Sequence, residues 1–326
     1  MSKRPWVAYL ALGGTIAMTA RDGGLTPNID AAGLVASARG AALPFEVVSR
    51  TVRQAPSAGL RYADIAELAS LVREAAAQGA QGAVITMGTD TLEETAFGLD
   101  LLLDLDTPVV VTGALRGPEQ PGADGPANLL CALLVAASPA AAGLGVLVVM
   151  NEEIHAARFV RKAHTHKASA FESPALGPLG WVAEGRVRIL LRPTSRSPVL
   201  QWRSEPPFVP LIALGLSSVG EELDPYLQRP PAAAVLAALG AGHASAACTE
   251  RLGTLAAQVP VVLASRVGAG EIYRHTYGYA GAEIDLLSRG LIHGGFLDPF
   301  KARVLLSLLI AQGADRAQIE HVFASL

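Results

Sequence analysis

The chain has 326 residues, which is too long for one minimal core and suits two compact domains. Apolar residues make up 51% and charged residues only 17%, a composition that excludes a disordered protein. The net charge is −3, and no cluster of Lys and Arg is interleaved with aromatic residues, which argues against nucleic-acid binding. No apolar run is long enough to span a membrane, so we expect no membrane association.

The N-terminal segment and the two cysteines indicate a reducing compartment. The first apolar run leads directly into Gly13, Gly14 and Thr15, so we interpret it as a buried strand rather than a signal peptide. Cys131 and Cys248 lie in different halves of the chain among apolar or small residues, which favours two buried thiols over a disulfide. We therefore expect a cytoplasmic protein.

In the first half of the chain, short apolar runs alternate with amphipathic stretches. Two helices are predicted between these runs. The second begins after Asp90 and Thr91, either of which could cap it. Repeated strand–helix–strand units predict an α/β fold with a doubly wound, mostly parallel sheet. The predicted strands span residues 6–12, 82–86, 107–112 and 144–150, and the predicted helices span residues 62–78 and 92–103.

The alternation breaks between residues 193 and 210, a segment rich in Pro and Ser that we interpret as a linker. This organisation predicts a larger N-terminal α/β domain over residues 1–192 and a smaller C-terminal α/β domain over residues 211–326. A helix near the C-terminus is apolar nearly all round and should be buried or lie at an interface. In this half the strands are predicted at 209–216, 233–239 and 259–264, and the helix at 300–312.

Polar residues follow two of the predicted strands where an open parallel sheet binds its ligands, beyond the carboxyl ends of the strands. Thr15 follows two glycines after the first strand, and Thr89 and Asp90 follow Gly88 after the second. Glycine lets the backbone turn sharply and approach a ligand closely. The alternative for each segment is that the residue only caps a helix. For Thr15 taken alone, capping is favoured over a functional role, and for Asp90 the two interpretations are equally favoured.

Three basic residues further along the chain are candidates for chemistry. Lys162 could activate a threonine hydroxyl, which is a poor nucleophile by itself, although a lone lysine is normally solvated. His164 and His166 would share one face of an extended segment, as paired metal ligands do. Because no matching cluster of ligands stands elsewhere in the sequence, we interpret them as polar or partly packed side chains, and we expect no metal and no cofactor.

Two segments stand in order in the first third of the chain: LGGTIA at residues 12–17 and ITMGTDTLEET at residues 85–95. Together with five further segments they resemble the bacterial-type L-asparaginase family over nearly the whole chain. The further matches are VTGALR at 111–116, ADGPANL at 123–129, VVMNEE at 148–153, AFESP with GPLG within 170–180, and KARVLL at 301–306.

The resemblance implies a threonine-nucleophile amidohydrolase that acts on L-asparagine. In that family Thr15 would attack the side-chain amide, release ammonia and form an aspartyl ester that water then cleaves. Thr89, Asp90 and Lys162 match the second catalytic group, in which Lys162 tunes the Thr89 hydroxyl and Asp90 also holds the substrate ammonium. Backbone N–H groups around Thr89 are our candidates for the oxyanion hole. The family also implies a homotetramer, a dimer of dimers, in which a neighbouring subunit completes each active site.

The resemblance implies three further substrate-binding residues. Ser57 matches the residue that binds the substrate α-carboxylate. Ser245 falls where the family carries Asn or Ser, and Glu283 aligns with the acidic residue that reaches the substrate ammonium across the subunit interface.

One departure from the family concerns the lid loop at residues 20–27. Leu25 stands where the family carries a Tyr that hydrogen-bonds the nucleophile, and no Tyr occurs between Tyr9 and Tyr62. Leucine can close a lid but cannot donate a hydrogen bond. Three alternatives to an asparaginase therefore stay open: an amidohydrolase acting on another amide such as L-glutamine, a catalytically weak amino-acid sensor, and a metal-dependent hydrolase that uses His164 and His166.

Overall fold

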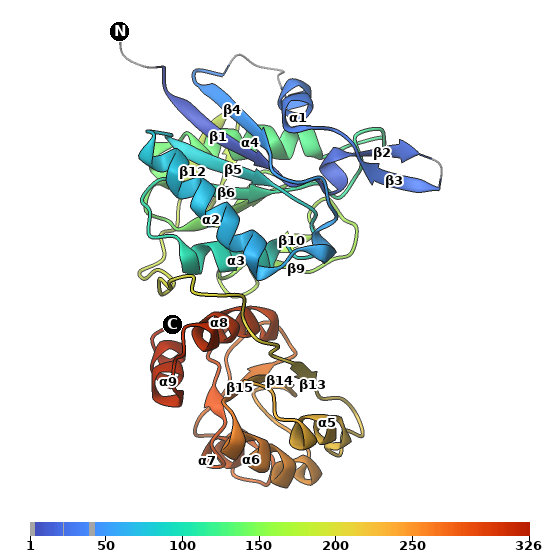
Figure 1. Ribbon diagram of the computed structural model, residues 1–326, viewed down its shortest axis with the longest axis vertical. Coiled ribbons are helices and arrows are strands. Elements are labelled where there is room, and N and C mark those ends of the chain that lie inside the picture. Colours follow the sequence, from blue (N-terminus) through green and yellow to red (C-terminus); the bar gives the residue numbers. More distant parts are fainter. Residues whose placement is uncertain (1–3, 22, 39–42) are drawn as a thin grey trace. The chain divides into compact units, whose positions relative to one another are not determined.

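The computed structural model describes residues 4–21, 23–38 and 43–326. The chain divides into two compact units, Met1–Val199 and Leu200–Leu326. In Figure 1 the first unit runs from blue to yellow-green and the second from ochre to red. The division falls inside the segment 193–210 that the sequence assigns to a linker.

The N-terminal unit is built on an eight-stranded sheet with the order β12-β11-β8-β7-β6-β5-β1-β4. Strands β4, β1, β5, β6 and β7 are parallel to their neighbours, whereas β8, β11 and β12 extend the sheet in antiparallel fashion. The mostly parallel sheet predicted for this unit is confirmed, and the antiparallel edge was not predicted. The strands are β1 (Trp6–Ala11), β4 (Glu46–Thr51), β5 (Gly82–Thr86), β6 (Val109–Thr112), β7 (Val146–Met150), β8 (Glu153–Ala156), β11 (Gly180–Ala183) and β12 (Arg186–Ile189).

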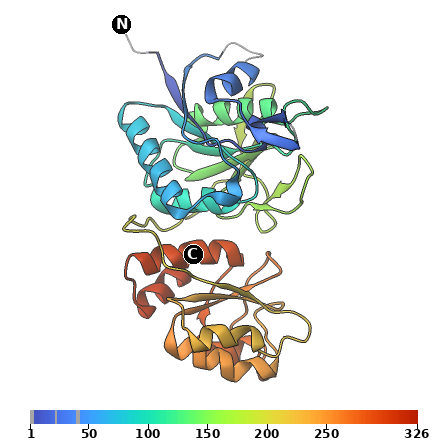
Figure 2. The ribbon, with the colours of Figure 1, turned by 45° about the vertical axis from the view of Figure 1, so that its right-hand side comes forward.

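Helices cover both faces of this sheet, as a doubly wound fold requires. Figure 2 shows the strands between one pair of helices, α1 (Ala31–Ala38) and α4 (Gly125–Ala136), and a second pair, α2 (Tyr62–Ala77) and α3 (Leu92–Leu102). Alternate residues of the first strand, Val7, Tyr9 and Ala11, join the core under α1 and α4. The period of two along a strand thus gives each helix pair its own apolar surface.

Two short hairpins and three single turns complete the N-terminal unit. The sequence assigns residues 20–27 to a lid loop, and the structure forms a hairpin there from β2 (Met18–Arg21) and β3 (Gly24–Pro27). A second hairpin consists of β9 (Arg161–Lys162) and β10 (Phe171–Glu172), which form a separate two-stranded sheet. The turns are the 3-10 helices η1 (Thr15–Ala17), η2 (Ser57–Gly59) and η3 (Pro139–Ala141).

The C-terminal unit has a four-stranded parallel sheet in the order β13-β14-β15-β16, which confirms the predicted α/β class. In Figure 2 the helices α5 and α6 lie on one side of these strands and α8 on the other. The strands are β13 (Leu211–Ala213), β14 (Ala234–Ala238), β15 (Val261–Ser265) and β16 (Ile292–His293). The helices are η4 (Glu221–Leu223), α5 (Asp224–Gln228), η5 (Ala246–Cys248), α6 (Thr249–Gln258), α7 (Glu283–Ser288), α8 (Pro299–Ala311) and α9 (Arg316–Ala324).

Most predicted elements exist within two residues of their predicted bounds, with one clear exception. The strand predicted over 209–216 is confined to Leu211–Ala213. Only Ile212 of that strand is buried, so the apolar run there is longer than the part that pairs. The all-round apolar helix predicted at 300–312 is α8, which buries nine of its residues.

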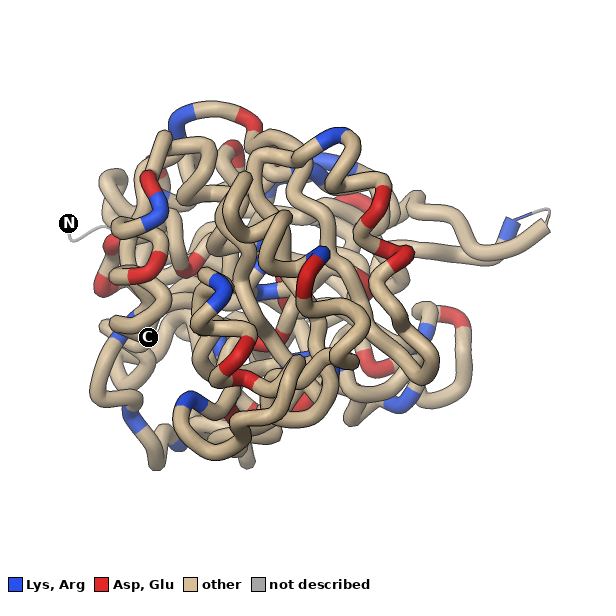
Figure 3. Tube along the Cα trace, turned by 90° about the horizontal axis from the view of Figure 1, so that it is seen from below, with Lys and Arg blue, Asp and Glu red and all other residues tan. Residues whose placement is uncertain are grey.

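Among the described residues no helix is both long and apolar enough to cross a membrane. Cys131 and Cys248 are buried free thiols, as the sequence predicts. Figure 3 shows Lys and Arg interspersed with Asp and Glu along the described chain, and no long basic run appears in this view.

One histidine is buried in the antiparallel edge of the sheet, where it is held in its neutral form. His155 on β8 is fully buried, and its Nδ1 lies 3.0 Å from the Ser173 hydroxyl. Its Nε2 lies 3.4 Å from a carboxylate oxygen of Glu153. Burial lowers the pKa of His155 to about 4, because desolvation disfavours the charged ring.

We expect acid to destabilise the protein through His155. Its pKa is near 6.5 in the unfolded chain and about 4 in the folded one, so between these values the unfolded chain binds more protons. The free energy of unfolding should therefore fall by up to about 3 kcal/mol as the pH drops from about 6.5 to 4. The melting temperature of His155→Gln should fall less over this range than that of the wild type. An equal fall in both would contradict the assignment, and His321→Gln is the exposed control.

Candidate active site

Neighbouring parallel strands deliver the candidate residues to one edge of the N-terminal sheet. Strands β4, β1 and β5 lie side by side and end at Thr51, Ala11 and Thr86. The segments that follow them carry Ser57, Thr15 and Thr89 with Asp90. Because carboxyl ends of parallel strands meet at one edge, residues far apart in sequence gather there.

Close backbone contact joins these three segments, and it depends on glycine. Gly14 has a φ of +82°, and a Cβ on it would lie 2.2 Å from the Gly88 nitrogen. A Cβ on Gly88 would in turn lie 2.7 Å from Ser57 Oγ. Side chains at positions 14 and 88 would therefore separate the segments, so glycine is required at both. The Thr15 turn consequently lies directly against the segment of Thr89.

Thr15 opens the short turn η1 and does not cap it. Gly14 occupies the N-cap position, and Thr15 is the first residue of the turn. The next two residues, Ile16 and Ala17, are buried and anchor the turn, whereas Thr15 is only partly buried. The helix-cap interpretation of Thr15 is therefore wrong, and Thr15 stands in the turn that follows the carboxyl end of β1.

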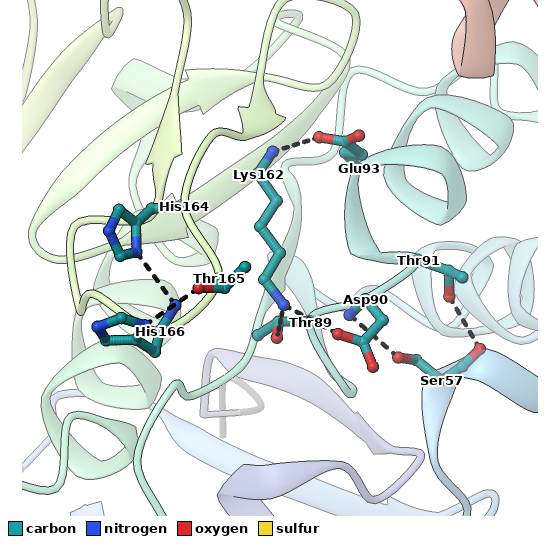
Figure 4. Close-up of polar contacts among 9 residues, drawn as sticks. All are labelled: Ser57, Thr89, Asp90, Thr91, Glu93, Lys162, His164, Thr165 and His166. Carbon is teal, nitrogen blue, oxygen red and sulfur yellow. Dashed lines mark hydrogen bonds and ion pairs between the residues drawn. The ribbon is translucent and has the colours of Figure 1, made fainter. Parts of the chain in front are cut away.

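Lys162 connects Thr89 and Asp90. Its Nζ donates to Thr89 Oγ1 at 2.9 Å and to Asp90 Oδ1 at 2.9 Å (Figure 4). The lysine side chain is 17% exposed and that of Asp90 is 70% exposed, so the ion pair opens to solvent on the Asp90 side. The alternative of a lone solvated lysine is wrong, because the ammonium lies between a hydroxyl and a carboxylate.

Ser57 fixes the backbone that carries these groups. Its Oγ accepts a hydrogen bond from the Asp90 amide at 3.2 Å, and its carbonyl accepts one from Thr91 Oγ1 at 2.9 Å. Thr91 occupies the N-cap position of α3 but makes no side-chain cap bond. Of the two predicted caps, Thr91 thus has the N-cap position, but neither side chain caps the helix, because the side chains of Asp90 and Thr91 bind Lys162 and Ser57 instead.

His164 and His166 lie to the left of the Lys162 side chain in Figure 4. They stand in a bend rather than in the predicted extended segment. Their ring centroids are 4.6 Å apart, and the His166 amide lies 3.2 Å from His164 Nδ1, its hydrogen-bond acceptor. No group of three His, Cys, Asp or Glu residues in the described part of the chain is arranged to hold a metal ion.

Comparisons with known proteins cover both units. The family of asparaginase N-terminal domains matches residues 6–195, and that of glutaminase/asparaginase C-terminal domains matches residues 209–323. A protein named "Probable L-asparaginase" from Deinococcus radiodurans is 39% identical over 98% of this chain and 97% of its own length. An "L-asparaginase" from Bacillus licheniformis is 34% identical over 94% of this chain and 95% of its own length. A "Glutaminase-asparaginase" from Pseudomonas fluorescens is 32% identical, with coverage of 97% and 89%.

The chain belongs to the asparaginase family. The family resemblance on the two motifs at residues 12–17 and 85–95 is thereby confirmed. In the N-terminal unit, the same two motifs supply the Thr15 turn and the Thr89–Asp90 segment that Gly14 and Gly88 bring into contact.

The two candidate residues of the C-terminal unit make internal contacts there. Glu283 begins α7 and is fully buried, and its Oε1 accepts the amides of Thr276 and Tyr277 at 2.8 and 2.7 Å. Its Oε2 lies 3.4 Å from His243 Nε2. Burial raises the pKa of Glu283, but these two amides and the charge of His243 outweigh it and leave the pKa lowered. Ser245 Oγ donates to the Ser218 carbonyl at 2.7 Å.

The lid hairpin of this asparaginase contacts the loop after β6. Leu25 is 42% exposed, and its Cδ1 lies 3.5 Å from where a Cβ on Gly117 would stand. The Ala20 amide donates to Glu119 Oε2 at 2.9 Å. Leu25 thus contributes apolar packing at the place where the family carries a tyrosine.

Sequence reasoning placed Asp124 and Asn128 in a family motif but assigned no role to either, and both fix loops at this edge. Asn128 is buried in α4, donates to the Gly113 carbonyl at 3.0 Å and accepts the Asn151 amide at 2.9 Å. Asp124 accepts the amides of Leu115 and Arg116. A single Asn within the apolar helix 125–136 was the available signal, since buried amides require partners.

Replacing Gly14 with alanine should displace the Thr15 turn from the segment of Thr89. The new Cβ would meet backbone atoms of Gly88, so the Thr15 turn must move, and misplacement by about 1 Å costs roughly 100-fold in rate. We expect Gly14→Ala to lose at least about 100-fold in kcat for ammonia release. Gly79→Ala is the matched control, because Gly79 also has a positive φ, of +88°, but no atom within 4 Å of its added Cβ. Similar activity in both variants would show that the contact with Gly88 is not required.

Proposed function

We propose that this protein is an L-asparaginase that hydrolyses L-asparagine to L-aspartate and ammonia through Thr15. The observation that carries the proposal is the position of the Lys162 ammonium, 2.9 Å from both Thr89 Oγ1 and Asp90 Oδ1. The segment of Thr89 and Asp90 lies against the Thr15 turn through the contact of Gly14 with Gly88. Membership of the asparaginase family and the names of its relatives support the same reaction.

Thr15 carries the acylation step. Its Oγ attacks the side-chain amide carbon, its proton passes to the amide nitrogen, and the C–N bond breaks to release ammonia and leave an aspartyl ester. The Asp90 amide is bound to Ser57, so the donors for the developing oxyanion would be the amides of Gly88 or Thr89. One such donor stabilises the transition state by about 3 kcal/mol.

Thr89 and Lys162 support the proton transfers and the cleavage of the ester by water. The Lys162 ammonium lies against Thr89 Oγ1, so it stabilises negative charge that develops on that oxygen. The Thr89 hydroxyl keeps its own proton for donation to the reacting groups. The pair therefore acts as a unit for charge and proton transfer beside the ester of Thr15.

The substrate's charged groups have candidate partners on the same segment. Ser57 Oγ accepts the Asp90 amide and keeps its own proton, which can be donated to the substrate α-carboxylate. The exposed carboxylate of Asp90 can bind the substrate ammonium. We further propose that Ser245 and Glu283 of a neighbouring subunit complete this pocket in a homotetramer built as a dimer of dimers.

We also propose a cytoplasmic location. The support comes from the two cysteines, Cys131 and Cys248, which are buried free thiols in separate units. A reducing compartment keeps such thiols unpaired.

L-Glutamine is the second candidate substrate. The Pseudomonas fluorescens relative is named a glutaminase-asparaginase, and the two substrates differ by one methylene group. One methylene changes discrimination by only about 1–3 kcal/mol in a fitted pocket, so activity on both amides is compatible with this site. An amino-acid sensor is the weaker alternative, because binding alone does not require a lysine between Thr89 and Asp90.

Ammonia release from L-asparagine tests the two threonines. Thr15→Ala and Thr89→Ala should each lose at least about 1,000-fold in kcat, because each removes a member of a catalytic unit. Thr165→Ala is the control, since this exposed threonine follows Lys162 by three residues in the sequence and its hydroxyl bonds the His166 ring (Figure 4). Activity should survive EDTA, and its loss would favour a metal-dependent hydrolase that uses His164 and His166. Binding of asparagine without turnover would instead favour a sensor.

A tyrosine at position 25 tests the departure in the lid. Leu25→Tyr restores a hydroxyl that can reach the nucleophile in the family, and one hydrogen bond is worth about 1 kcal/mol. We expect kcat to rise about fivefold. Leu25→Phe adds the ring without the hydroxyl and should not give this increase. An equal effect of both substitutions would assign the change to packing on Gly117 rather than to hydrogen bonding.

A further inference from the structure

The backbone that carries Lys162 belongs to a small hairpin outside the main sheet. Strands β9 and β10 contain two residues each and pair only with each other. A two-stranded hairpin of this length is marginally stable by itself. The position of the Lys162 ammonium therefore depends on contacts that attach the hairpin to the rest of the unit.

The pairing of the hairpin leaves the Lys162 amide free for another acceptor. Lys162 stands opposite Phe171, and the next amide along, that of Ala163, donates to the Ala170 carbonyl at 2.7 Å. Amides alternate in direction along an antiparallel pair, so the Lys162 amide points away from β10. It donates to a carboxylate oxygen of Glu93, as Figure 4 shows.

Glu93 lies in the first turn of α3, directly after the segment of Thr89 and Asp90. The helix is firmly held, because Leu92, Phe97 and Leu99 are fully buried. Helix α3 and the turn directly before it therefore contact both ends of the same lysine. The carboxylate of Glu93 binds the backbone amide, and Thr89 with Asp90 binds the ammonium.

We propose that Glu93 is a positioning residue that fixes the Lys162 backbone so that the ammonium reaches Thr89. This role rests on the proposed amidohydrolase function. Glu93 has no direct part in the chemistry, because its carboxylate lies at the backbone end of the lysine, away from the ammonium, in Figure 4. Loss of the contact should thus lower turnover while substrate binding through Ser57 is retained.

Three variants separate positioning from other effects of a carboxylate. Glu93→Ala should lower kcat about 10- to 100-fold with KM for L-asparagine changed by less than about threefold. Glu93→Gln should recover most of kcat, because its amide oxygen still accepts from the Lys162 N–H. Glu94→Ala is the matched control: Glu94 is in the same helical turn and is half-buried like Glu93, so it has a similar interaction with the helix dipole.

A double-mutant cycle tests whether Glu93 acts through Lys162. If it does, Glu93→Ala added to Lys162→Ala should cause no further loss of kcat beyond that of Lys162→Ala alone. A further 10-fold loss would show an independent role and overturn the proposal. Equal losses in Glu93→Ala and Glu94→Ala would also overturn it, and so would a Glu93→Gln variant as impaired as Glu93→Ala.

Amide hydrogen exchange tests the contact without any turnover. Exchange in the segment 160–172 should be faster in Glu93→Ala than in the wild type, and unchanged in Glu94→Ala. This measurement remains informative if the wild type does not hydrolyse asparagine, so failure of the proposed function is distinguishable from failure of the positioning role. Unchanged exchange in Glu93→Ala would refute the attachment of the hairpin by Glu93.

Discussion

The contact between the backbones of Gly14 and Gly88 is the constraint on which the candidate site depends. Adjacent parallel strands bring their ends to one edge, but they do not by themselves bring the following segments into atomic contact. The absence of a Cβ at both positions allows the Thr15 turn, the Thr89 segment and Ser57 to touch. The strand core beneath, in which Tyr9 and Thr86 are joined by a buried hydrogen bond of 2.8 Å, holds that contact in place.

Lys162 is then bound from both ends by residues of one segment. A lysine of limited exposure needs partners for its charge, and Thr89 and Asp90 provide them at 2.9 Å. The same interactions that satisfy the ammonium also place it on a reactive hydroxyl. The contacts that satisfy the charge of Lys162 therefore also give it the geometry that the proposed mechanism needs. His155 differs, because its burial is accommodated by loss of charge.

Elements that show as a continuous run of apolar residues could be predicted from the sequence. Strands β1, β5 and β7 are continuous apolar runs buried on both faces, and they were predicted within two residues of their bounds. Strand β4 was missed because only alternate residues are partly buried and it lies at the sheet edge. Thr15, Thr89 and Asp90 were found from strand ends and from family motifs. The bond from Lys162 to Glu93 spans 69 residues, and no local pattern reports such a contact.

The lid hairpin packs against the N-terminal unit although position 25 carries a leucine. The hairpin β2–β3 rests on the loop after β6 through Leu25 and Glu119, and Asp124 fixes the turn of that loop at Leu115 and Arg116. Position 25 thus still packs against the loop, but leucine cannot make the hydrogen bond to the proposed nucleophile that the family resemblance implies for a tyrosine there. Because leucine has no hydrogen-bonding group, the proposed mechanism assigns the electrostatic part of catalysis to Lys162, Thr89 and backbone amides. Under the proposed mechanism, the attachment of Lys162 by Glu93 therefore matters more in this chain than it would in one with the lid tyrosine.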